Sequence, residues 1–500
     1  MARRIEHRPV LLDWACALLL GAGVALVNCW RTGRPSLLGD EAATVSIASR
    51  SPGDLWAMVT SHSDAVHGVY YAFMHAWFTL FGVDETTVRV PSAIAVGMAV
   101  AGIVMIGSTF VSRAAGLSAG VLLAALPATL MAATVGRSFA LQLAFVTWLA
   151  LALLLALERG RAWRWIVVGV LVTLSVTLFL YAVLVVASFG LAILLHRPWR
   201  ARFLPFLIAA GIGAIPAIPI VILGYRQRNQ IAWIEPIGVD IFQNVFVTQW
   251  FAGVIHAPAG YPAWLAFVTA AMFLGLSVLG FVHAWRRQGH LRGLATLAAC
   301  WATVPTVALV AASLAIDPLY SPPYLTMSGP AIAVLAALGV ASLRARWLQL
   351  VILAVIFASA LPPFFALREK SSHRTDWDAV AEYLAANASE GDAVLVDRDP
   401  WDLPHMLFDL YPAQMDGLRD IAFAQDAAEA VSLWDVRVEP EDLEIPPSVS
   451  RIWVVSGDEG SNEWFELLDE EEFDSSTHTE LEFSTLTLYE RRARGDRDPG

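Results

Sequence analysis

Two adjacent carboxylates, Asp40 and Glu41, follow the first long apolar stretch of the chain, in the segment Leu37-Leu38-Gly39-Asp40-Glu41. Partial desolvation beside lipid raises the pKa of a carboxyl group and makes its carboxylate a competent general base. Neighbouring residues of a helix point about 100° apart. One carboxylate could therefore act on a substrate hydroxyl while the other binds a cation or an arginine. The alternative is a purely structural role at the start of a helix. Asp40 would then cap the helix, and the negative charge of Glu41 would interact favourably with the helix dipole.

Two basic patches could bind an anionic lipid that carries a sugar. Arg137, in ATVGRSFAL, lies between two apolar stretches, where its guanidinium either binds a phosphate or extends to lipid headgroups. The stretch YRQRNQIAW suits phosphate and sugar binding, or headgroup anchoring, through guanidinium groups, an amide and an indole. Its candidate residues are Arg226, Arg228, Gln230 and Trp233.

The apolar segment HGVYYAFMHAWFTLFG, residues 67–82, contains His67, Tyr70 and His75. A histidine here is either an ordinary interfacial hydrogen-bonding group or a metal ligand. We predict a helix that lies in the membrane interface instead of crossing it. The aromatic residues expected at headgroup level are Tyr70, Tyr71, Trp77 and Phe81.

The composition excludes a soluble globular protein, because 57% of the 500 residues are hydrophobic and only 16% are charged. Residues 369–500 hold 33 of the 45 acidic residues and 10 of the 33 basic ones, so this part has a net charge of −23. The preceding part has a net charge of +11. We predict a membrane domain at 1–369 with outer loops at 29–89 and 225–262, an acidic α/β domain at 370–490 and a disordered tail at 491–500. A nucleic-acid partner is excluded, since no basic patch lies on a soluble face.

Eleven membrane spans are predicted, because about 20 apolar residues cover the hydrocarbon core of a bilayer. They are residues 10–28, 90–111, 116–135, 138–157, 165–180, 181–195, 203–224, 263–285, 293–315, 325–343 and 347–367. The run at 165–195 is too long for one helix and is therefore divided into two short crossings. Loops on one side hold fifteen arginines and the opposite loops hold seven, which places the N-terminus in the cytoplasm and the acidic domain outside. The first span is expected to be retained, because its apolar run is too long for a cleaved signal peptide.

The acidic domain shows helical and strand patterns in alternation. Residues 376–389 have helical spacing, and residues 391–397, 451–457 and 484–490 have the composition of strands. About 130 residues are enough for a small core of their own.

The ordered set of segments resembles the GT-C superfamily of integral-membrane glycosyltransferases, in the branch of bacterial dolichyl-phosphate-mannose-type mannosyltransferases. The segments are Gly39-Asp40-Glu41, SDAVHGVYYAFMHAWFTLFG, TVRVPSAIA, GRSFAL and SPPYLTMSGPAIAVLAALG. The resemblance covers most of residues 10–370. It implies an α-helical polytopic membrane fold of about eleven transmembrane helices with a small C-terminal α/β extracytoplasmic domain.

The resemblance also implies roles for individual residues. Asp40 is the expected catalytic carboxylate, supported by Glu41. Arg137 is the candidate for the donor phosphate, and His67 with Tyr70 for the donor or acceptor site. Tyr324 occupies the place of the tyrosine in a motif near the last spans.

The implied reaction moves a sugar, mannose or arabinofuranose, from a polyprenyl-phosphate donor to an envelope glycan, lipid or protein acceptor. It takes place at the outer face of the bacterial plasma membrane with inversion at the sugar carbon. Some relatives use a divalent cation such as Mg²⁺ or Mn²⁺ and others do not, so the metal requirement stays open.

Three positions depart from the pattern of the family. Val135 stands where relatives often have an acidic residue, Phe139 where a tyrosine is common, and Pro323 where an arginine often precedes the tyrosine. Either an arginine of the 225–233 stretch compensates for the missing charge, or the substrate differs, or activity is lost.

Two functions of other classes are the alternatives. A transporter or flippase of lipid-linked precursors usually has ionisable groups near the bilayer midplane. Here Asp13 and His283 are the ionisable residues of the spans, and both lie toward cytoplasmic ends. A catalytically degenerate scaffold with the acidic domain as its binding module would explain Val135 and Pro323.

Overall fold

The computed structural model describes residues 10–61, 63–159, 161–252, 262–287, 289–397, 406–457 and 464–492. The chain divides into two compact units. The membrane unit contains residues 1–32, 64–70 and 89–368, and the loop-and-tail unit contains residues 33–63, 71–88 and 369–500. Most of the loop at 29–89, which the sequence analysis grouped with the membrane domain, thus clusters with the tail. From residue 493 on, the segment predicted to be disordered lies outside the described residues.

Within the described residues, the helices of the membrane unit correspond to the eleven predicted spans. Eight helical stretches are long and apolar enough to cross a membrane, the bent pair of α6 and α7 is a ninth, and α9 and α10 are shorter apolar helices. The division of residues 165–195 into two segments is confirmed, since α9 ends at Leu178 and α10 begins at Ala182.

The helices of this unit are α1 (Leu11–Cys29), α5 (Glu85–Phe110), α6 (Arg113–Ala124), α7 (Pro127–Thr134), α8 (Phe139–Arg159), α9 (Ala162–Leu178), α10 (Ala182–Leu195), α11 (Phe203–Ala214), α12 (Ile218–Arg226), α13 (Ile241–Gln243), α14 (Ala263–Arg286), α15 (His290–Ala315), α16 (Gly329–Ser342) and α17 (Arg346–Ala366). Shorter 3-10 segments are η1 (Ala65–His67), η2 (Arg197–Arg202), η3 (Ile215–Ala217), η4 (Arg228–Ile231) and η6 (Pro322–Ser328), and η5 (Asn244–Ala252) is a π-helix.

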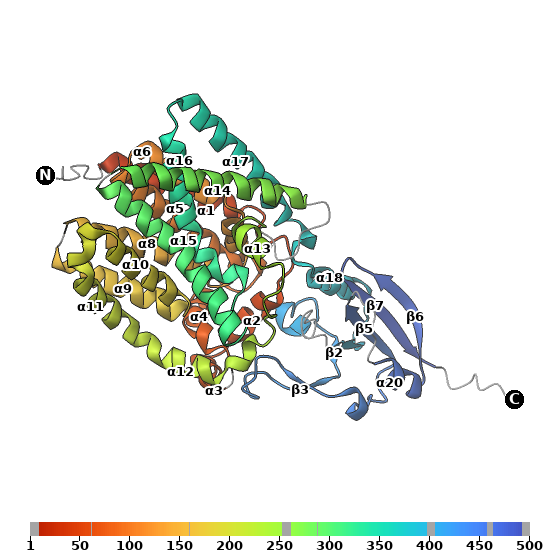
Figure 1. Cartoon of the computed structure of the whole chain (residues 1–500). Helices are drawn as coiled ribbons and strands as arrows, with labels where there is room; N and C mark the ends of the chain where they lie inside the picture. The colour runs from red at the N-terminus through yellow and green to blue at the C-terminus, as the bar shows by residue number, and fades with distance from the viewer. Residues whose placement is uncertain are drawn as a thin grey trace, which may run out of the picture. The chain divides into compact units, whose positions relative to one another are not determined.

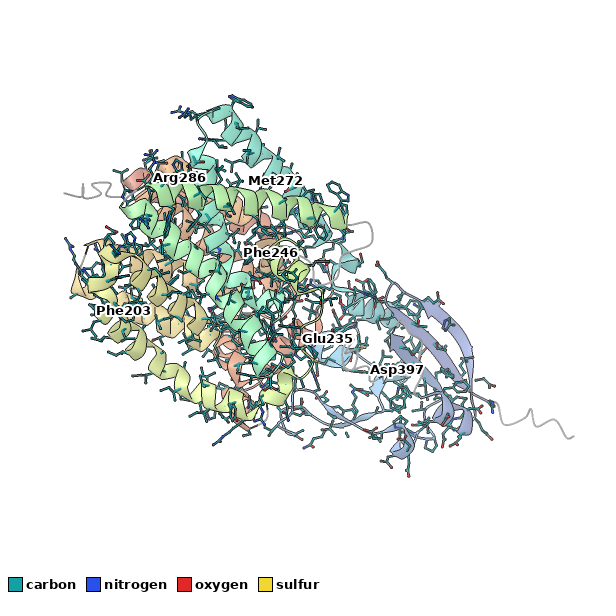
Figure 2. The ribbon with its side chains drawn as sticks, viewed as in Figure 1. Phe203, Glu235, Phe246, Met272, Arg286 and Asp397 are labelled. Atoms are coloured by element: carbon teal, nitrogen blue, oxygen red, sulfur yellow. The ribbon has the colours of Figure 1, made fainter. Side chains whose placement is uncertain are left out.

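Small residues allow the helices of the membrane unit to pack closely, as for α14 and α16 (Figure 1). A Cβ atom at Gly280 would lie 2.0 Å from the carbonyl oxygen of Leu335, and one at Gly339 would lie 2.2 Å from that of Leu276. Only glycine permits this approach, and membrane helices depend on such contacts because lipid supplies no hydrophobic force between them. Figure 2 shows Met272 along α14 and Arg286 at its C-terminal end, where a charge can reach the membrane surface.

A buried arginine joins the C-terminal end of α1 to the end of α17. Arg368 is 1% exposed, and its guanidinium donates to the carbonyl oxygens of Trp30 (2.9 Å), Asn28 (3.2 Å) and Phe364 (2.8 Å). It also donates to the side-chain oxygen of Asn28 (3.0 Å). Carbonyl oxygens at the C-terminal end of a helix have no hydrogen-bond donor within the helix. The guanidinium supplies the donors that these oxygens need and that lipid cannot provide.

We expect Arg368→Met to lower the free energy of unfolding by about 3 kcal/mol, because it leaves several buried carbonyl oxygens without a donor. The measurement is thermal unfolding of the purified protein in detergent. Arg346→Met is the matched control, since Arg346 is exposed at the other end of α17 and its removal should change the melting temperature little. Equal melting temperatures for the two variants would contradict the assigned role of Arg368.

The loop-and-tail unit combines helices with a sheet that has five strands among the described residues. The strand order is β2-β1-β5-β7-β6, with β1 parallel to β2 and β5, and β7 antiparallel to β5 and β6. Three predicted strands and the predicted helix are present as β1, β5, β7 and α18, so the α/β class is confirmed. The strands are β1 (Ala393–Val396), β2 (Arg419–Asp420), β5 (Arg451–Gly457), β6 (Phe473–Glu480), β7 (Ser484–Arg491) and the separate pair β3 (Phe423–Gln425) and β4 (Val436–Arg437).

The first outer loop contributes to the core of this unit. Ala42 is fully buried in one apolar cluster with Trp377, Val394 and Trp453 of the tail. The helices of the unit are α2 (Gly39–Ala48), α3 (Pro52–Ser61), α18 (Trp377–Asn387), α19 (Leu407–Leu410), α20 (Phe465–Glu470) and residues 71–81 of α4 (Gly68–Phe81), with 3-10 segments η7 (Lys370–His373) and η9 (Pro440–Asp442). The acidic pair of α2 is therefore held by the same core that folds the tail.

Helix α4 is present as predicted, but its aromatic residues are divided between a buried face and an exposed face. Tyr70 and Tyr71 are 1% and 0% exposed, whereas Phe73 and Phe81 are 39% and 57% exposed. Tyr70 and Tyr71 are therefore covered by protein, and their predicted position at headgroup level stays a prediction. The aromatic run alone does not reveal which face of the helix packs against protein.

Candidate active site

The acidic pair lies in the first turn of α2, which begins after an extended Leu38. Glu41 Oε2 accepts the backbone N–H of Leu38 (3.1 Å). This bond satisfies a donor that the helix itself cannot pair, so Glu41 caps the helix. The alternative with Asp40 as the cap is wrong, because Leu38 occupies the N-cap position.

The two carboxylates have different surroundings. Asp40 is exposed, whereas Glu41 is fully buried. This difference follows from the angle of about 100° between consecutive helical side chains. The side chain of Asp40 thus reaches the surface, whereas that of Glu41 is enclosed and caps the helix. The expected desolvation of Asp40 depends on adjacent lipid, so it stays a prediction.

Glu41 has a histidine neighbour that the sequence analysis did not identify. His373 Nδ1 lies 3.8 Å from Glu41 Oε2 and 2.8 Å from the carbonyl oxygen of Ser36, and both ionisable side chains are buried. His373 ends η7, at the start of the tail. No local motif connects residues so far apart, and only the placement of a histidine just after the last span hinted at a role.

Arg137 lies in the turn between α7 and α8, in the membrane unit. Its side chain is 7% exposed, and its backbone N–H donates to the carbonyl oxygen of Val135 (2.9 Å). Ser92 of α5 donates to the same carbonyl (2.7 Å), which holds the turn against α5. Burial argues against the alternative in which the guanidinium of Arg137 extends to headgroups, because such a guanidinium would be exposed.

Tyr324 belongs to a cluster of four aromatic rings near this turn. Its ring centroid lies 6.3 Å from that of Phe139, 5.5 Å from that of Phe179 and 5.6 Å from that of Tyr181. The structure therefore brings together the GRSFAL segment and the SPPYLTM segment. Phe179 and Tyr181 were missed, although the break between the two short crossings marks their position. Such a cluster offers ring faces to a sugar or an isoprenoid.

Four buried side-chain oxygens adjoin the same turn. Among the described residues, the oxygens of Thr129, Ser138, Gln142 and Ser328 have no hydrogen-bond partner. The amide nitrogen of Gln142 approaches the sulfur of Met327 (3.8 Å), and Thr129 adjoins Gly329, so both lie beside the segment that contains Ser328. Buried polar groups of this kind normally bind water or a polar ligand.

The polar stretch after α12 divides into structural and exposed residues. Gln230 accepts the backbone N–H of Asp64 (3.0 Å) through its side-chain oxygen and so holds the start of η1. Arg226 and Arg228 are exposed, and Trp233 is 49% exposed. Their exposure fits both alternatives for this stretch, substrate binding and headgroup anchoring.

The histidines of the aromatic segment differ in their surroundings. His67, at the end of η1, is half-buried, three residues before the buried Tyr70. His75 Nδ1 lies 2.9 Å from the carbonyl oxygen of Ala48, which is an ordinary hydrogen-bonding role. In the described parts of the chain, no group of three or more His, Cys, Asp and Glu side chains could hold a metal ion.

The candidate residues therefore lie in both units. Asp40 and Glu41 belong to the loop-and-tail unit. The membrane unit contains His67, Tyr70, Arg137, Tyr324 and the 226–233 stretch.

Comparison with protein families gives one match. Residues 67–223 match the family model described as dolichyl-phosphate-mannose-protein mannosyltransferase. This segment includes His67, Tyr70 and Arg137. No curated protein matches the chain.

Solved structures resemble the chain over nearly its whole length. ArnT from Cupriavidus metallidurans bound to undecaprenyl phosphate is 14% identical, with 96% of this chain and 98% of that chain covered and a TM-score of 0.57. The same protein in the apo state is 13% identical, with coverages of 94% and 97% and a TM-score of 0.57. The arabinofuranosyltransferase AftD from Mycobacteria is 14% identical, with 99% of this chain but 41% of that chain covered and a TM-score of 0.52. At these identities the likeness shows a shared fold.

Proposed function

We propose that this chain, which has the GT-C fold expected from its sequence and a mannosyltransferase-family segment at residues 67–223, is a membrane glycosyltransferase with a polyprenyl-phosphate sugar donor. The observation that carries the proposal is the buried Arg137 within that segment, beside an aromatic cluster and buried hydroxyl groups. A guanidinium in such surroundings suits a lipid phosphate. The fold relative ArnT is described with undecaprenyl phosphate bound.

The proposed reaction is a single displacement at the anomeric carbon. The acceptor oxygen bonds to this carbon while the bond from the carbon to the donor phosphate oxygen breaks. The hydroxyl proton passes to the carboxylate of Asp40, and polyprenyl phosphate leaves with inversion. General-base help of this kind typically contributes about 10²- to 10⁴-fold.

Arg137 is proposed to stabilise the charge that develops on the leaving phosphate. A divalent cation is the alternative source of positive charge. Transfer in the presence of a chelator distinguishes them, because a reaction that depends on Arg137 alone proceeds unchanged.

The sugar and the site of action belong to the same proposal. Mannose agrees with the description of the family model and arabinofuranose with that of AftD. The excess of arginine in loops of one side supports a cytoplasmic N-terminus and an outer-face reaction in a bacterial plasma membrane. The acceptor is then an envelope glycan, lipid or protein.

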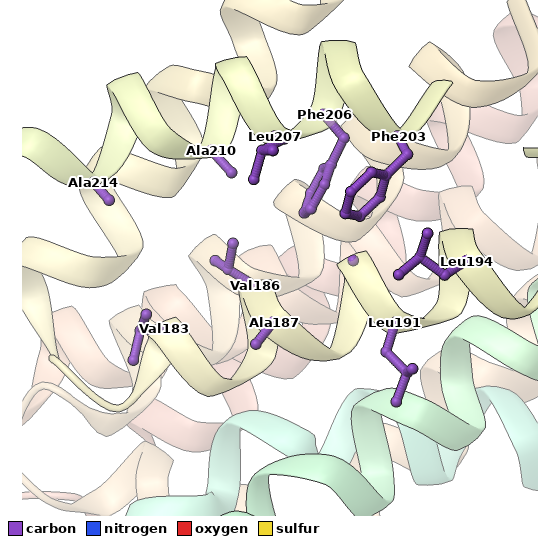
Figure 3. Close-up of a pocket in the computed structure, with 11 residues that line it drawn as sticks. Val183, Val186, Ala187, Leu191, Leu194, Phe203, Phe206, Leu207, Ala210 and Ala214 are labelled. Carbon is purple, nitrogen blue, oxygen red and sulfur yellow. The ribbon is translucent and has the colours of Figure 1, made fainter. Parts of the chain in front are cut away.

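An apolar groove between α10 and α11 is proposed to hold the isoprenoid chain of the donor. The groove has a volume of about 480 Å³ and is lined by apolar residues alone, among them Val186, Leu191, Phe206 and Ala210 (Figure 3). It lies inside the family-matched segment. An apolar chain in this groove is shielded without any unpaired polar group.

We expect Ala210→Trp to raise the KM for a long-chain donor about tenfold, equivalent to about 1.4 kcal/mol of lost apolar contact, and to leave kcat unchanged. A donor analogue with a short chain should show no change, because it does not reach the groove. Ile212→Trp is the control, since Ile212 is 64% exposed on the same helix and does not line the groove. A similar KM increase for both variants would contradict this assignment.

The proposed function is tested by mass spectrometry of lipids that copurify with the protein, followed by a transfer assay in vesicles. A bound polyprenyl-phosphate sugar that is consumed on addition of an acceptor supports it. Movement of the labelled lipid across the bilayer without sugar transfer would instead indicate a transporter. Binding without turnover of any donor would indicate a scaffold.

A further inference from the structure

We infer that Tyr181 binds the donor at the point where the isoprenoid chain meets the phosphate. Its hydroxyl donates to a phosphate oxygen, and its ring covers the end of the apolar groove. The inference rests on the proposed function, because it takes the polyprenyl-phosphate donor and the groove between α10 and α11 from there. Tyr181, the groove and Arg137 all belong to the membrane unit.

Tyr181 lies in the break between α9 and α10. Helix α9 ends at Leu178, and Tyr181 occupies the N-cap position of α10. The two other residues of the break face protein. Phe179 is 6% exposed, and Leu180 lies against Gly224 of α12, 3.7 Å from where a Cβ atom would stand. Tyr181 is half-buried, so part of its side chain can contact a ligand.

The apolar groove has one end next to this break. Val183, in the first turn of α10, and Ala214, the last residue of α11, line the groove. Figure 3 shows these two residues at one end of the groove and Leu194 and Phe203 at the other. Between Val183 and Leu194 the helix rises about 16 Å. Tyr181 precedes Val183 by two residues, so it lies just beyond the Val183 end of the groove.

The ring of Tyr181 connects this end of the groove to the turn that carries Arg137. Its centroid lies 5.5 Å from that of Phe179 and 5.6 Å from that of Tyr324. The ring of Tyr324 lies 6.3 Å from that of Phe139, which begins α8 two residues after Arg137. The path from the groove to the proposed phosphate ligand therefore runs along these rings, with Tyr181 at the groove end.

The hydroxyl of Tyr181 is suited to a phosphate oxygen. Among the described residues, this hydroxyl has no hydrogen-bond partner. The first polar atoms of a donor beyond its apolar chain are the phosphate oxygens, which accept hydrogen bonds. A phenol keeps its proton at neutral pH and donates, and a bond to a charged acceptor is stronger than one between neutral groups.

The position of the Tyr181 ring is fixed by its neighbour. The ring packs edge-on against Phe179, with an angle of 80° between the two planes. The hydroxyl is therefore held at a defined place beyond the groove. Tyr181 thus sets how far the donor enters the groove and presents the phosphate to Arg137.

The experiment measures binding of a long-chain polyprenyl phosphate and of the matching polyprenol to the purified protein in detergent. We expect Tyr181→Phe to weaken binding of the phosphate about tenfold, because it loses one hydrogen bond to a charged group and keeps the ring. Binding of the polyprenol should stay within about twofold. Tyr181→Ala should weaken binding of both ligands, since it removes the ring as well.

Tyr320→Phe is the control. Tyr320 is a buried tyrosine of the same unit, and its hydroxyl donates to Gln249 Oε1 (3.1 Å). Loss of this bond should lower the melting temperature and leave the binding of polyprenyl phosphate by the folded variant unchanged. The inference is overturned if Tyr181→Phe binds the phosphate as the parent protein does, if it weakens polyprenol binding equally, or if Tyr320→Phe has the same effect.

A second measurement tests the orientation of the donor without any substitution. A polyprenyl phosphate with a photoreactive group in the isoprene unit next to the phosphate should label peptides that contain Val183 or Ala214. Labelling at Leu194, Phe203 or the arginines of η2 (Arg197–Arg202), or at neither end, would overturn the inference. Labelling that an excess of phosphatidylglycerol abolishes would indicate a general headgroup site and would overturn it too.

Failure of the proposed function is distinguishable from failure of this inference. If the parent protein neither binds polyprenyl phosphate nor transfers a sugar from it, the proposed function fails and the inference falls with it. That outcome is visible before any variant is compared. If the parent protein binds and transfers while Tyr181→Phe behaves like the parent, the inference alone is wrong.

Discussion

Replacing Asp40 with Asn is expected to lower kcat for sugar transfer by about 10²- to 10⁴-fold, because the amide cannot accept the proton of the acceptor hydroxyl. The donor KM should stay within about threefold, since Asn has the size and shape of Asp. The melting temperature should not fall, because Asp40 is exposed and does not cap α2. The measurement is initial-rate transfer in vesicles with the donor varied, together with thermal unfolding in detergent.

Asp54→Asn provides the matched comparison for Asp40→Asn. Asp54 is also an exposed aspartate in the first turn of a helix of the same unit, where it accepts the hydroxyl of Ser51 (2.6 Å). Its replacement removes the same charge from a helix N-terminus and should leave kcat unchanged. Retention of full activity by Asp40→Asn would show that another group takes the proton. Equal losses in both variants would point to a general electrostatic effect.

The span pattern could be predicted from the sequence because it depends on local composition. An apolar run of sufficient length must form a helix in lipid, where every backbone group needs an internal partner. The break in the 165–195 run was predictable for the same reason, since the run exceeds the thickness of the bilayer. The structure places this break at Phe179 and Tyr181.

The assignment of roles within the acidic pair could be predicted only in part. The geometry of a helix requires Asp40 and Glu41 to face different surroundings. It does not determine which of the two is buried. That outcome depends on Ala42 packing into the core of the tail and on His373, both of which are contacts across most of the chain. No local pattern contains such information.

The departures from the family pattern have local explanations in the structure. Pro323 lies in the first turn of η6, where a missing N–H costs nothing, and its carbonyl accepts the hydroxyl of Thr326 (2.8 Å). Val135 is 4% exposed, and its carbonyl organises the turn that carries Arg137. Both residues thus fit the backbone that they occupy.

Replacing Arg137 with Gln is expected to lower kcat by about 10²- to 10³-fold, the usual cost of removing one donor that stabilises charge in a transition state. Arg137→Lys keeps the positive charge but cannot form bidentate hydrogen bonds to a phosphate, so it should retain more activity than Arg137→Gln. Because Arg137 is buried, its loss could also weaken the fold, so each rate is measured on protein whose melting temperature is known. Arg164→Gln separates the two effects, since Arg164 is a buried arginine of the same unit that donates to the carbonyl oxygen of Leu155 (3.0 Å).

Arg164→Gln should lower the melting temperature and leave the kcat of the folded protein unchanged. Arg226→Gln and Arg228→Gln test whether an arginine of the 225–233 stretch compensates for the charge that the family pattern has and this chain lacks. Both residues are exposed, and either could supply the charge at the phosphate. If Arg137 is the phosphate ligand, these two variants keep kcat and change at most the KM. A loss of kcat confined to Arg226→Gln or Arg228→Gln, with Arg137→Gln fully active, would move the donor phosphate to the membrane surface. The buried turn between α7 and α8 would then have a structural role only.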